Sequence, residues 1–255
     1  MLTPDASPWK ALLWAATSLP LWSGLVGQER LHVRWLVSPA KPPEKHDSNK
    51  PSFLLIPWFL CNANVMTRIG KELEEKYNVY YAKISRADWV YKSLPQMAQE
   101  LKDEISNLLH NYETNWNLHL MWHSLWGVVE LIALSMGTNI AVNTVYQLAA
   151  PNEWWTPLGK LPIISRIPAV RGMQKWATEL RFHKDSFHGI ESVIALSDNF
   201  VPHMNQAHGN LSIPDDVKRG HHLIPWAEHM DLILKEKTVK HTLESLGLKS
   251  DLRNQ

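Results

Sequence analysis

Short apolar runs and longer amphipathic stretches alternate along this chain from about residue 53 onward. Short apolar runs are typical of buried strands, whereas apolar positions three or four residues apart are typical of helices that pack on a core. Strands are predicted at residues 31–37, 53–57, 79–84, 118–122, 142–149, 192–197 and 222–225. Helices are predicted at residues 64–77, 95–112 and 231–246, and another follows residue 124 and runs to about residue 136. This alternation indicates an α/β fold with a mostly parallel, doubly wound sheet covered on both faces.

Some segments stand outside the alternation. Residues 11–27 form a mostly apolar run that is short for a membrane-spanning helix, so we expect a helix that lies on a membrane surface or is buried in the fold. Residues 38–51, rich in Pro, Lys and Asp, indicate a solvated linker. The chain thus divides into an N-terminal part, residues 1–50, and an α/β domain, residues 51–255. Within that domain, the apolar residues and prolines around 157–190 indicate either a small apolar cap insertion or an ordinary helical excursion.

Composition and charge exclude several kinds of function. The 255 residues carry a formal net charge of +1 with interspersed charges, and the chain lacks the Lys/Arg clusters with interleaved aromatic residues that bind nucleic acid. A single cysteine, Cys61, cannot form an intramolecular disulfide and offers no metal-ligand spacing. We therefore expect no nucleic-acid partner, no metal and no cofactor.

Ser124 lies in the most informative pattern of the chain. The apolar strand predicted at 118–122 leads into His123, Ser124 and Leu125, and Gly127 opens a valine-rich apolar stretch. A serine on a sharp strand-to-helix turn, with its hydroxyl exposed above a sheet, is the arrangement of a nucleophile elbow. The segment resembles the Gly-His-Ser-Leu-Gly elbow of the α/β-hydrolase superfamily, in particular of its lipase- and esterase-like serine hydrolases.

Further segments resemble motifs of the same superfamily, in the same order along the chain. Residues 54–60 resemble the oxyanion loop, and residues 150–158 resemble the Pro-His-Gly-Gly-Thr-Pro-Leu run of lipase-like members. The strand and turn up to residue 202 resemble the segment that presents the acid, and residues 224–229 resemble the Pro-Gly-x-x-His that carries the catalytic histidine. The resemblance covers roughly residues 50–247 and implies a sheet of the α/β-hydrolase type.

The resemblance also implies a catalytic triad in the chain order Ser, Asp, His. Ser124 would be the nucleophile, Asp198 the acid and His229 the base. The oxyanion hole would consist of the backbone N–H groups of Phe59 and Leu125. Plain structural roles explain the same residue types, because serine is a common helix N-cap and aspartate often closes a turn after a strand. Weaker candidates for the acid are Asp215, Asp216 and Asp231, whereas His221 and His222 have no special claim to the role of the base.

Tryptophan stands wherever these motifs have glycine. The positions are Trp58, Trp122, Trp126, Trp154, Trp155 and Trp226. The chain has 13 tryptophans and only 11 glycines among 255 residues, whereas glycine makes up about 7% of average proteins. We interpret the six as glycines written as tryptophan, since some bacterial lineages read the codon UGA as glycine. Two alternatives explain the same letters: genuine tryptophans in a diverged, inactive relative, or deliberate substitutions. If the tryptophans are genuine, the two indoles at Trp122 and Trp126 are expected to prevent the elbow from closing.

The function predicted from these residues is that of a serine hydrolase that cleaves carboxylic esters, similar to lipases and esterases, through an acyl-enzyme. The apolar residues around 157–190 favour ester or lipid substrates with acyl chains. An acyltransferase or a thioesterase would use the same triad. If the tryptophans are genuine, an inactive binding protein with the same fold is expected instead. The expected location is cytoplasmic or membrane-associated, with peripheral membrane contact through residues 11–27.

Overall fold

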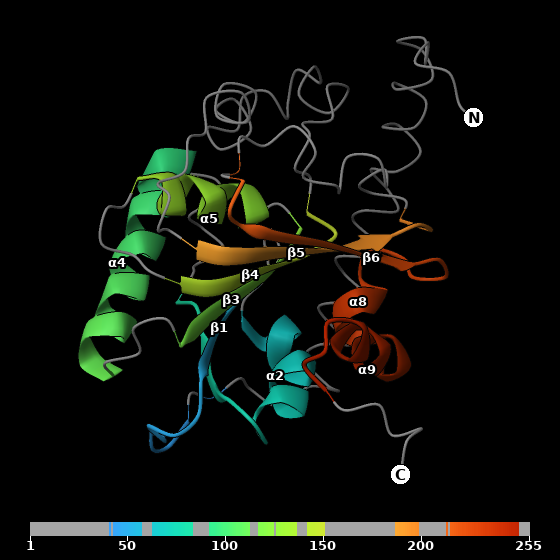
Figure 1. The fold of residues 1–255 in the computed structure, drawn as a ribbon, viewed down its shortest axis with the longest axis horizontal. Helices are drawn as coiled ribbons and strands as arrows, with labels where there is room; N and C mark the ends of the chain where they lie inside the picture. The colour runs from blue at the N-terminus through green and yellow to red at the C-terminus, as the bar shows by residue number, and fades with distance from the viewer. Residues whose placement is uncertain are drawn as a thin grey trace, which may run out of the picture.

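A computed structural model describes residues 41, 43–57, 63–83, 92–112, 117–124, 126–136, 142–150, 187–198, 213 and 215–249. Six strands in these ranges form one parallel sheet in the order β2-β1-β3-β4-β5-β6 (Figure 1). The strands are β1 (Ser52–Ile56), β2 (Asn78–Tyr81), β3 (Leu118–His123), β4 (Val142–Leu148), β5 (Phe187–Ala195) and β6 (Lys218–Ile224). The predicted α/β architecture with a parallel sheet is confirmed.

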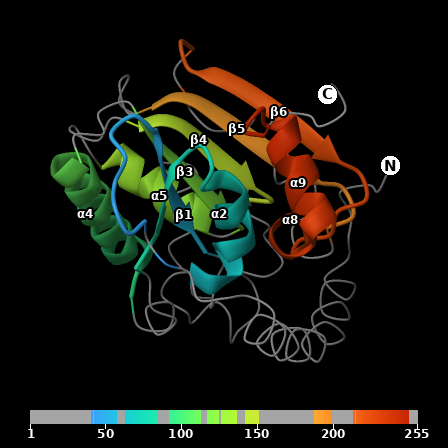
Figure 2. The ribbon, with the colours of Figure 1, turned by 90° about the horizontal axis from the view of Figure 1, so that it is seen from below.

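Helices cover both faces of this sheet, as Figures 1 and 2 show from two directions. Helices α4 (Leu94–Tyr112) and α5 (Trp126–Ser135) lie on one face. The other face carries the 3₁₀ turn η1 (Ala63–Met66) and helices α2 (Thr67–Leu73), α8 (Asp231–Leu234) and α9 (Glu236–Ser245). Each face has its own apolar core, which explains why most residues of the central strands β1, β3 and β4 are apolar and buried.

Strand β3 shows how the alternation of side chains divides these cores. Leu120 and Trp122 belong to the core beneath α4 and α5, whereas Met121 belongs to the core on the side of α2 and α9. Successive side chains of a strand point to opposite faces of the sheet. His123, the last residue of β3, therefore lies on the face of Met121 and is fully buried.

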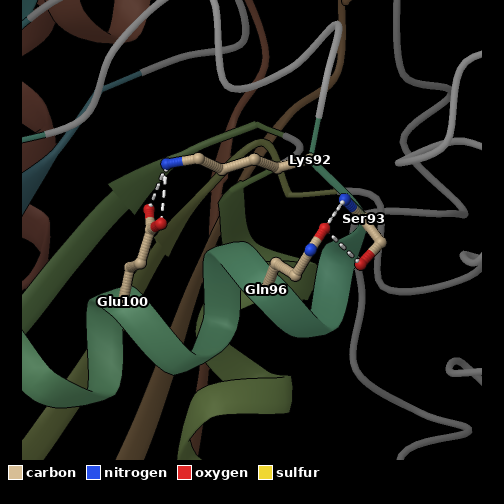
Figure 3. A network of polar contacts seen from close by, with 4 residues as sticks. All are labelled: Lys92, Ser93, Gln96 and Glu100. Carbon is tan, nitrogen blue, oxygen red and sulfur yellow. Dashed lines mark hydrogen bonds and ion pairs between the residues drawn. The ribbon is translucent and has the colours of Figure 1, made fainter.

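Helix α4 begins with one half of a capping box, drawn in Figure 3. The backbone N–H and the hydroxyl of Ser93 both donate to the side-chain oxygen of Gln96, at 2.8 Å and 3.0 Å. In a capping box, the side chain of the third helical residue reaches back in this way to the backbone N–H of the residue that caps the helix. Lys92 adds an ion pair to Glu100 at 2.6 Å. The sequence prediction placed the start of this helix one residue later, at Pro95.

Two strands extend further toward the N-terminus than predicted. Strand β5 begins at Phe187 instead of residue 192, so the last residues of the predicted cap are part of the sheet. Strand β6 begins at Lys218 instead of residue 222. It is the last strand of the described sheet, and its residues Lys218, Arg219 and His221 are exposed. Polar residues are tolerated on an edge strand, which is why a search for apolar runs found only its end.

The predicted C-terminal helix is two helices, which corrects the single span of 231–246. Lys235, between α8 and α9, has an extended backbone with φ −82° and ψ 116°. The break leaves the carbonyl group of Leu234 to accept from the guanidinium group of Arg68 on α2. An amphipathic pattern continues across such a break, so the sequence alone does not reveal it.

The order of the strands reverses between β1 and β3. From β1 the chain adds β2 on one side and then crosses to β3 on the other side. Ligands of open α/β sheets bind outside the carboxyl ends of the strands at such a switch point. Ser124 directly follows β3 and therefore lies at this point.

Several predicted segments lie outside the described residues: residues 11–27, the strand at 31–37 and the cap up to residue 186. Among the helices of the described ranges, none is long and apolar enough to cross a membrane.

Candidate functional site

Ser124 has the backbone conformation expected of a nucleophile on a sharp turn. Its φ is +62°, in the left-handed region, and its residue surface is 4% exposed. For residues other than glycine this region costs roughly 1–2 kcal/mol. The Ser124 N–H donates to the Leu148 carbonyl group at 2.9 Å, which anchors the turn to β4. Strain of this kind is concentrated at functional sites.

Asp198 and His229 meet beyond the carboxyl ends of the last two strands. The Nδ1–H of His229 donates to Oδ2 of Asp198 at 2.6 Å, across 31 positions of the sequence. Only 1% of the His229 side chain and none of the Asp198 side chain is exposed. A short charge-assisted hydrogen bond of this kind fixes the tautomer and the position of the ring. The second ring nitrogen of His229, Nε2, is then the atom that can accept a proton.

Two further hydrogen bonds connect the loops that carry this pair. The hydroxyl of Ser197, next to Asp198, donates to the Pro225 carbonyl group at 2.8 Å. The N–H of Leu196 donates to the Ile224 carbonyl group at 3.2 Å, which continues the pairing of β5 and β6 by one residue. The two loops are therefore held together independently of the Asp198–His229 contact.

His123 contacts His229 from the end of β3. The Nε2–H of His123 donates to the His229 backbone carbonyl group at 2.8 Å. The two imidazole rings lie 4.5 Å apart between centroids and are tilted by 51°. Burial, and next the neighbouring His229, hold the pKa of His123 well below its usual value, so that His123 is neutral. The sequence pattern predicts His123 only as a flanking residue of the motif, because its contact with a residue 106 positions away leaves no local signal.

The alternative acids and bases occupy other environments. Asp215 is exposed and lies 3.9 Å from Arg219. Asp231 pairs with Lys235 at 2.9 Å. His222 pairs with Glu191 at 2.9 Å. Asp216 and His221 are exposed. Of the candidate residues, the structure thus brings together Asp198 and His229.

Both proposed oxyanion donors, Phe59 and Leu125, lie outside the described residues, as do Trp58, Trp154 and Trp155. Within the described ranges, no three His, Cys, Asp or Glu side chains gather closely enough to hold a metal ion.

The expectation that an indole at position 122 prevents the turn at Ser124 is wrong. Its side chain is fully buried on the face of α4 and α5, while β3 continues to His123 and Ser124 keeps its left-handed turn. The indole therefore enters the core under the helices and not the turn itself. Its Nε1–H is buried and finds no hydrogen-bond acceptor in the part of the chain that the structure describes. Trp226 is 53% exposed and its ring lies 4.9 Å from that of His241.

Comparisons by sequence found nothing, since neither a family model nor a curated protein matches this chain. Solved structures do match. A lipase from Bacillus licheniformis in its mature form has 12% identity and a TM-score of 0.57, covering 82% of this chain and 96% of its own.

An α/β-hydrolase enzyme from the metagenome of sediments of the Mar Chica lagoon, Morocco, has 12% identity and a TM-score of 0.54, with coverage of 77% and 90%. The RedJ thioesterase of prodiginine biosynthesis in Streptomyces coelicolor has 11% identity and a TM-score of 0.54, with coverage of 85% and 92%. Each match covers most of both chains. The sheet order, the helices on both faces and these similarities together show that this chain has the α/β-hydrolase fold.

Proposed function

We propose that this protein is a serine hydrolase that cleaves carboxylic esters, with Ser124 as nucleophile, His229 as base and Asp198 as acid. The observation that carries the proposal is the buried 2.6 Å contact between His229 and Asp198. A histidine held by a buried carboxylate at the carboxyl end of a parallel sheet is positioned to serve as a general base. The strained turn at Ser124 supports the role of nucleophile.

In the acylation half of the reaction, Oγ of Ser124 attacks the ester carbonyl carbon and its proton passes to Nε2 of His229. Asp198 remains ionised and stabilises the imidazolium ion that forms. The tetrahedral intermediate then collapses, the carbon–oxygen bond to the alcohol breaks, and His229 returns the proton to the departing alcohol. The acyl group stays on Ser124 as an ester.

Deacylation repeats these steps with water. His229 takes a proton from water, the hydroxide attacks the acyl-enzyme, and Oγ of Ser124 leaves with the proton that His229 holds. The backbone N–H groups of Phe59 and Leu125 are the proposed donors to the oxyanion in both halves. Loss of one such donor typically lowers the rate about 10²–10³-fold.

The proposed substrates are esters with an acyl chain, including lipids. The apolar residues around 157–190 support this class, because acyl-binding sites are lined predominantly by apolar side chains. The lipase from Bacillus licheniformis among the similar structures supports the same class. A cytoplasmic or membrane-associated location, with residues 11–27 touching the membrane surface, belongs to the same proposal.

Hydrolysis of p-nitrophenyl esters of increasing acyl length tests this function. We expect hydrolysis by the wild type and its loss in Ser124→Ala, with the preferred chain length showing the size of the acyl site. Ser135→Ala is the matched control, because the Ser135 hydroxyl donates to the Ile132 carbonyl group of its own helix. Equal rates for the wild type and Ser124→Ala would contradict the proposal.

A specific observation favours a second candidate, an inactive binding protein with the same fold. Trp122 occupies the place of a motif glycine and is fully buried. If Trp58 is equally genuine, its bulk in the oxyanion loop would disable catalysis even with an intact triad. Thioesterase activity is a variant of the first proposal, supported by the similarity to the RedJ thioesterase. Cleavage of an acyl thioester in preference to the matching ester would identify it.

A further inference from the structure

His123 makes two contacts with His229 that together restrict the proposed base from a second direction. Asp198 contacts the ring of His229 at Nδ1. This contact by itself still allows the ring to tilt about that atom. His123 donates to the His229 carbonyl group at 2.8 Å, which fixes the backbone, and its own ring lies 4.5 Å away, which limits the tilt.

We propose that His123 is a positioning residue that fixes the imidazole of His229 relative to Ser124, the proposed nucleophile and the next residue along the chain from His123. This inference rests on the proposed function, because it assigns a role within the same site. His123 is the last residue of β3 and directly precedes Ser124. A shift of the His229 loop therefore cannot occur without a strain on the strand that carries the nucleophile. The buried side chain of His123 thus fixes the positions of the two reacting groups relative to each other.

The protonation state of His123 suits this role. During each half of the reaction His229 would carry a positive charge, and a second imidazolium ion at 4.5 Å would oppose it. Burial keeps the pKa of His123 well below its usual value, so His123 stays neutral while His229 accepts the proton. Its Nε2–H remains a donor throughout, because the tautomer is set by the His229 carbonyl group.

Three substitutions separate positioning from simple packing. His123→Leu removes the donor and the ring, whereas His123→Gln keeps an amide N–H at a similar distance along the side chain. His119→Leu is the matched control, since His119 lies on the same strand and the same face but stacks on Phe53, with ring centroids 5.0 Å apart. Each variant is measured for thermal unfolding, for kcat and KM with a short-chain ester, and by proton NMR. The NMR signal is that of the Nδ1 proton of His229, which a short hydrogen bond to Asp198 shifts strongly downfield.

We expect His123→Leu to broaden or lose the downfield proton signal and to lower kcat about tenfold, as for loss of one hydrogen bond, with KM unchanged. His123→Gln is expected to retain the signal and to recover most of kcat, and His119→Leu is expected to keep the signal, kcat and KM of the wild type. A sharp signal in His123→Leu would overturn the inference, whatever the rate. If the Leu variant does not fold, the Gln variant decides by the same signal, and its loss would overturn the inference. If the signal responds as expected but the wild type hydrolyses no ester, the positioning role stands and the proposed function fails.

Discussion

Nδ1 of His229 lies 2.6 Å from Oδ2 of Asp198, although 31 residues separate the two along the chain. Both side chains are buried, on loops that follow the neighbouring strands β5 and β6. Parallel strands bring their carboxyl ends to the same edge of a sheet, so two loops from different parts of the chain can form one site. The proposed chemistry depends on this pair more than on any other contact.

Asp198→Asn tests the role of the carboxylate in orienting His229. An amide cannot stabilise the imidazolium ion and favours the wrong tautomer, and the corresponding change in a serine protease lowers kcat about 10⁴-fold. We expect a loss of about 10³–10⁴-fold in kcat with little change in KM, measured by steady-state ester hydrolysis. Asp215→Asn is the control, because the Asp215 side chain is exposed and its ion pair is with Arg219. Equal activity of the two variants would argue against a triad.

The strain at Ser124 is testable by stability. In the left-handed region a Cβ atom costs roughly 1–2 kcal/mol, and glycine avoids that cost. We expect Ser124→Gly to be at least as stable as Ser124→Ala in urea unfolding, because strain relief offsets the lost methyl group and the greater chain entropy. In the control, Ala133→Gly within α5 is expected to lose about 1 kcal/mol or more. If Ser124→Gly is less stable than Ser124→Ala by as much as Ala133→Gly is less stable than the wild type, the turn is unstrained.

Burial of His119 predicts that the protein is less stable in mild acid. Burial lowers the pKa of His119 from the usual 6.5 to about 4. Between these values the unfolded chain binds a proton that the folded protein does not, so stability falls as the pH decreases from 6.5 toward 4 and is fully present above 6.5. We expect the free energy of unfolding of His119→Leu to fall less over this interval than that of the wild type. Parallel curves for the two proteins would show that His119 does not contribute.

Much of this architecture could be predicted because both faces of the sheet are covered. Covered strands are mostly apolar, and the central strands β1, β3 and β4 were predicted within about two residues on this basis. Strand β6 was found only at its end, since an edge strand tolerates the exposed Lys218 and Arg219. The break at Lys235 left no signal, because the amphipathic pattern continues across it.

The candidate site was predictable to the extent that its parts lie in motifs. Ser124, Asp198 and His229 were each found by their place after a strand, and the structure brings Asp198 and His229 into contact. Their catalytic roles remain predictions. The contact of His123 with the His229 carbonyl group was not predictable, because it joins a side chain to a backbone atom of a distant loop.

The tryptophans at motif positions give a prediction about the gene and one about stability. We expect UGA codons at these positions and UGG at Trp9 and Trp176.

The buried Nε1–H of Trp122, which lacks a hydrogen-bond partner within the described ranges, costs about 1–3 kcal/mol. Because Trp122 is fully buried in the core, truncation of its indole also removes packing worth about 3–5 kcal/mol. Genuine tryptophans therefore predict a lower Tm for the double variant Trp122→Gly, Trp126→Gly, whereas native glycines predict a Tm equal to or above that of the tryptophan form.

Covalent labelling of Ser124 by a fluorophosphonate tests the central claim most directly. The probe reacts with a serine only when a neighbouring base activates it, and it requires no knowledge of the substrate. We predict one adduct per chain, located on Ser124 by peptide mass spectrometry, with labelling abolished in Ser124→Ala and strongly slowed in His229→Ala and Asp198→Ala. The tryptophan form and the form with glycine at all six motif positions are both tested. Absence of any adduct on Ser124 in both forms would contradict the account and favour a binding protein with this fold.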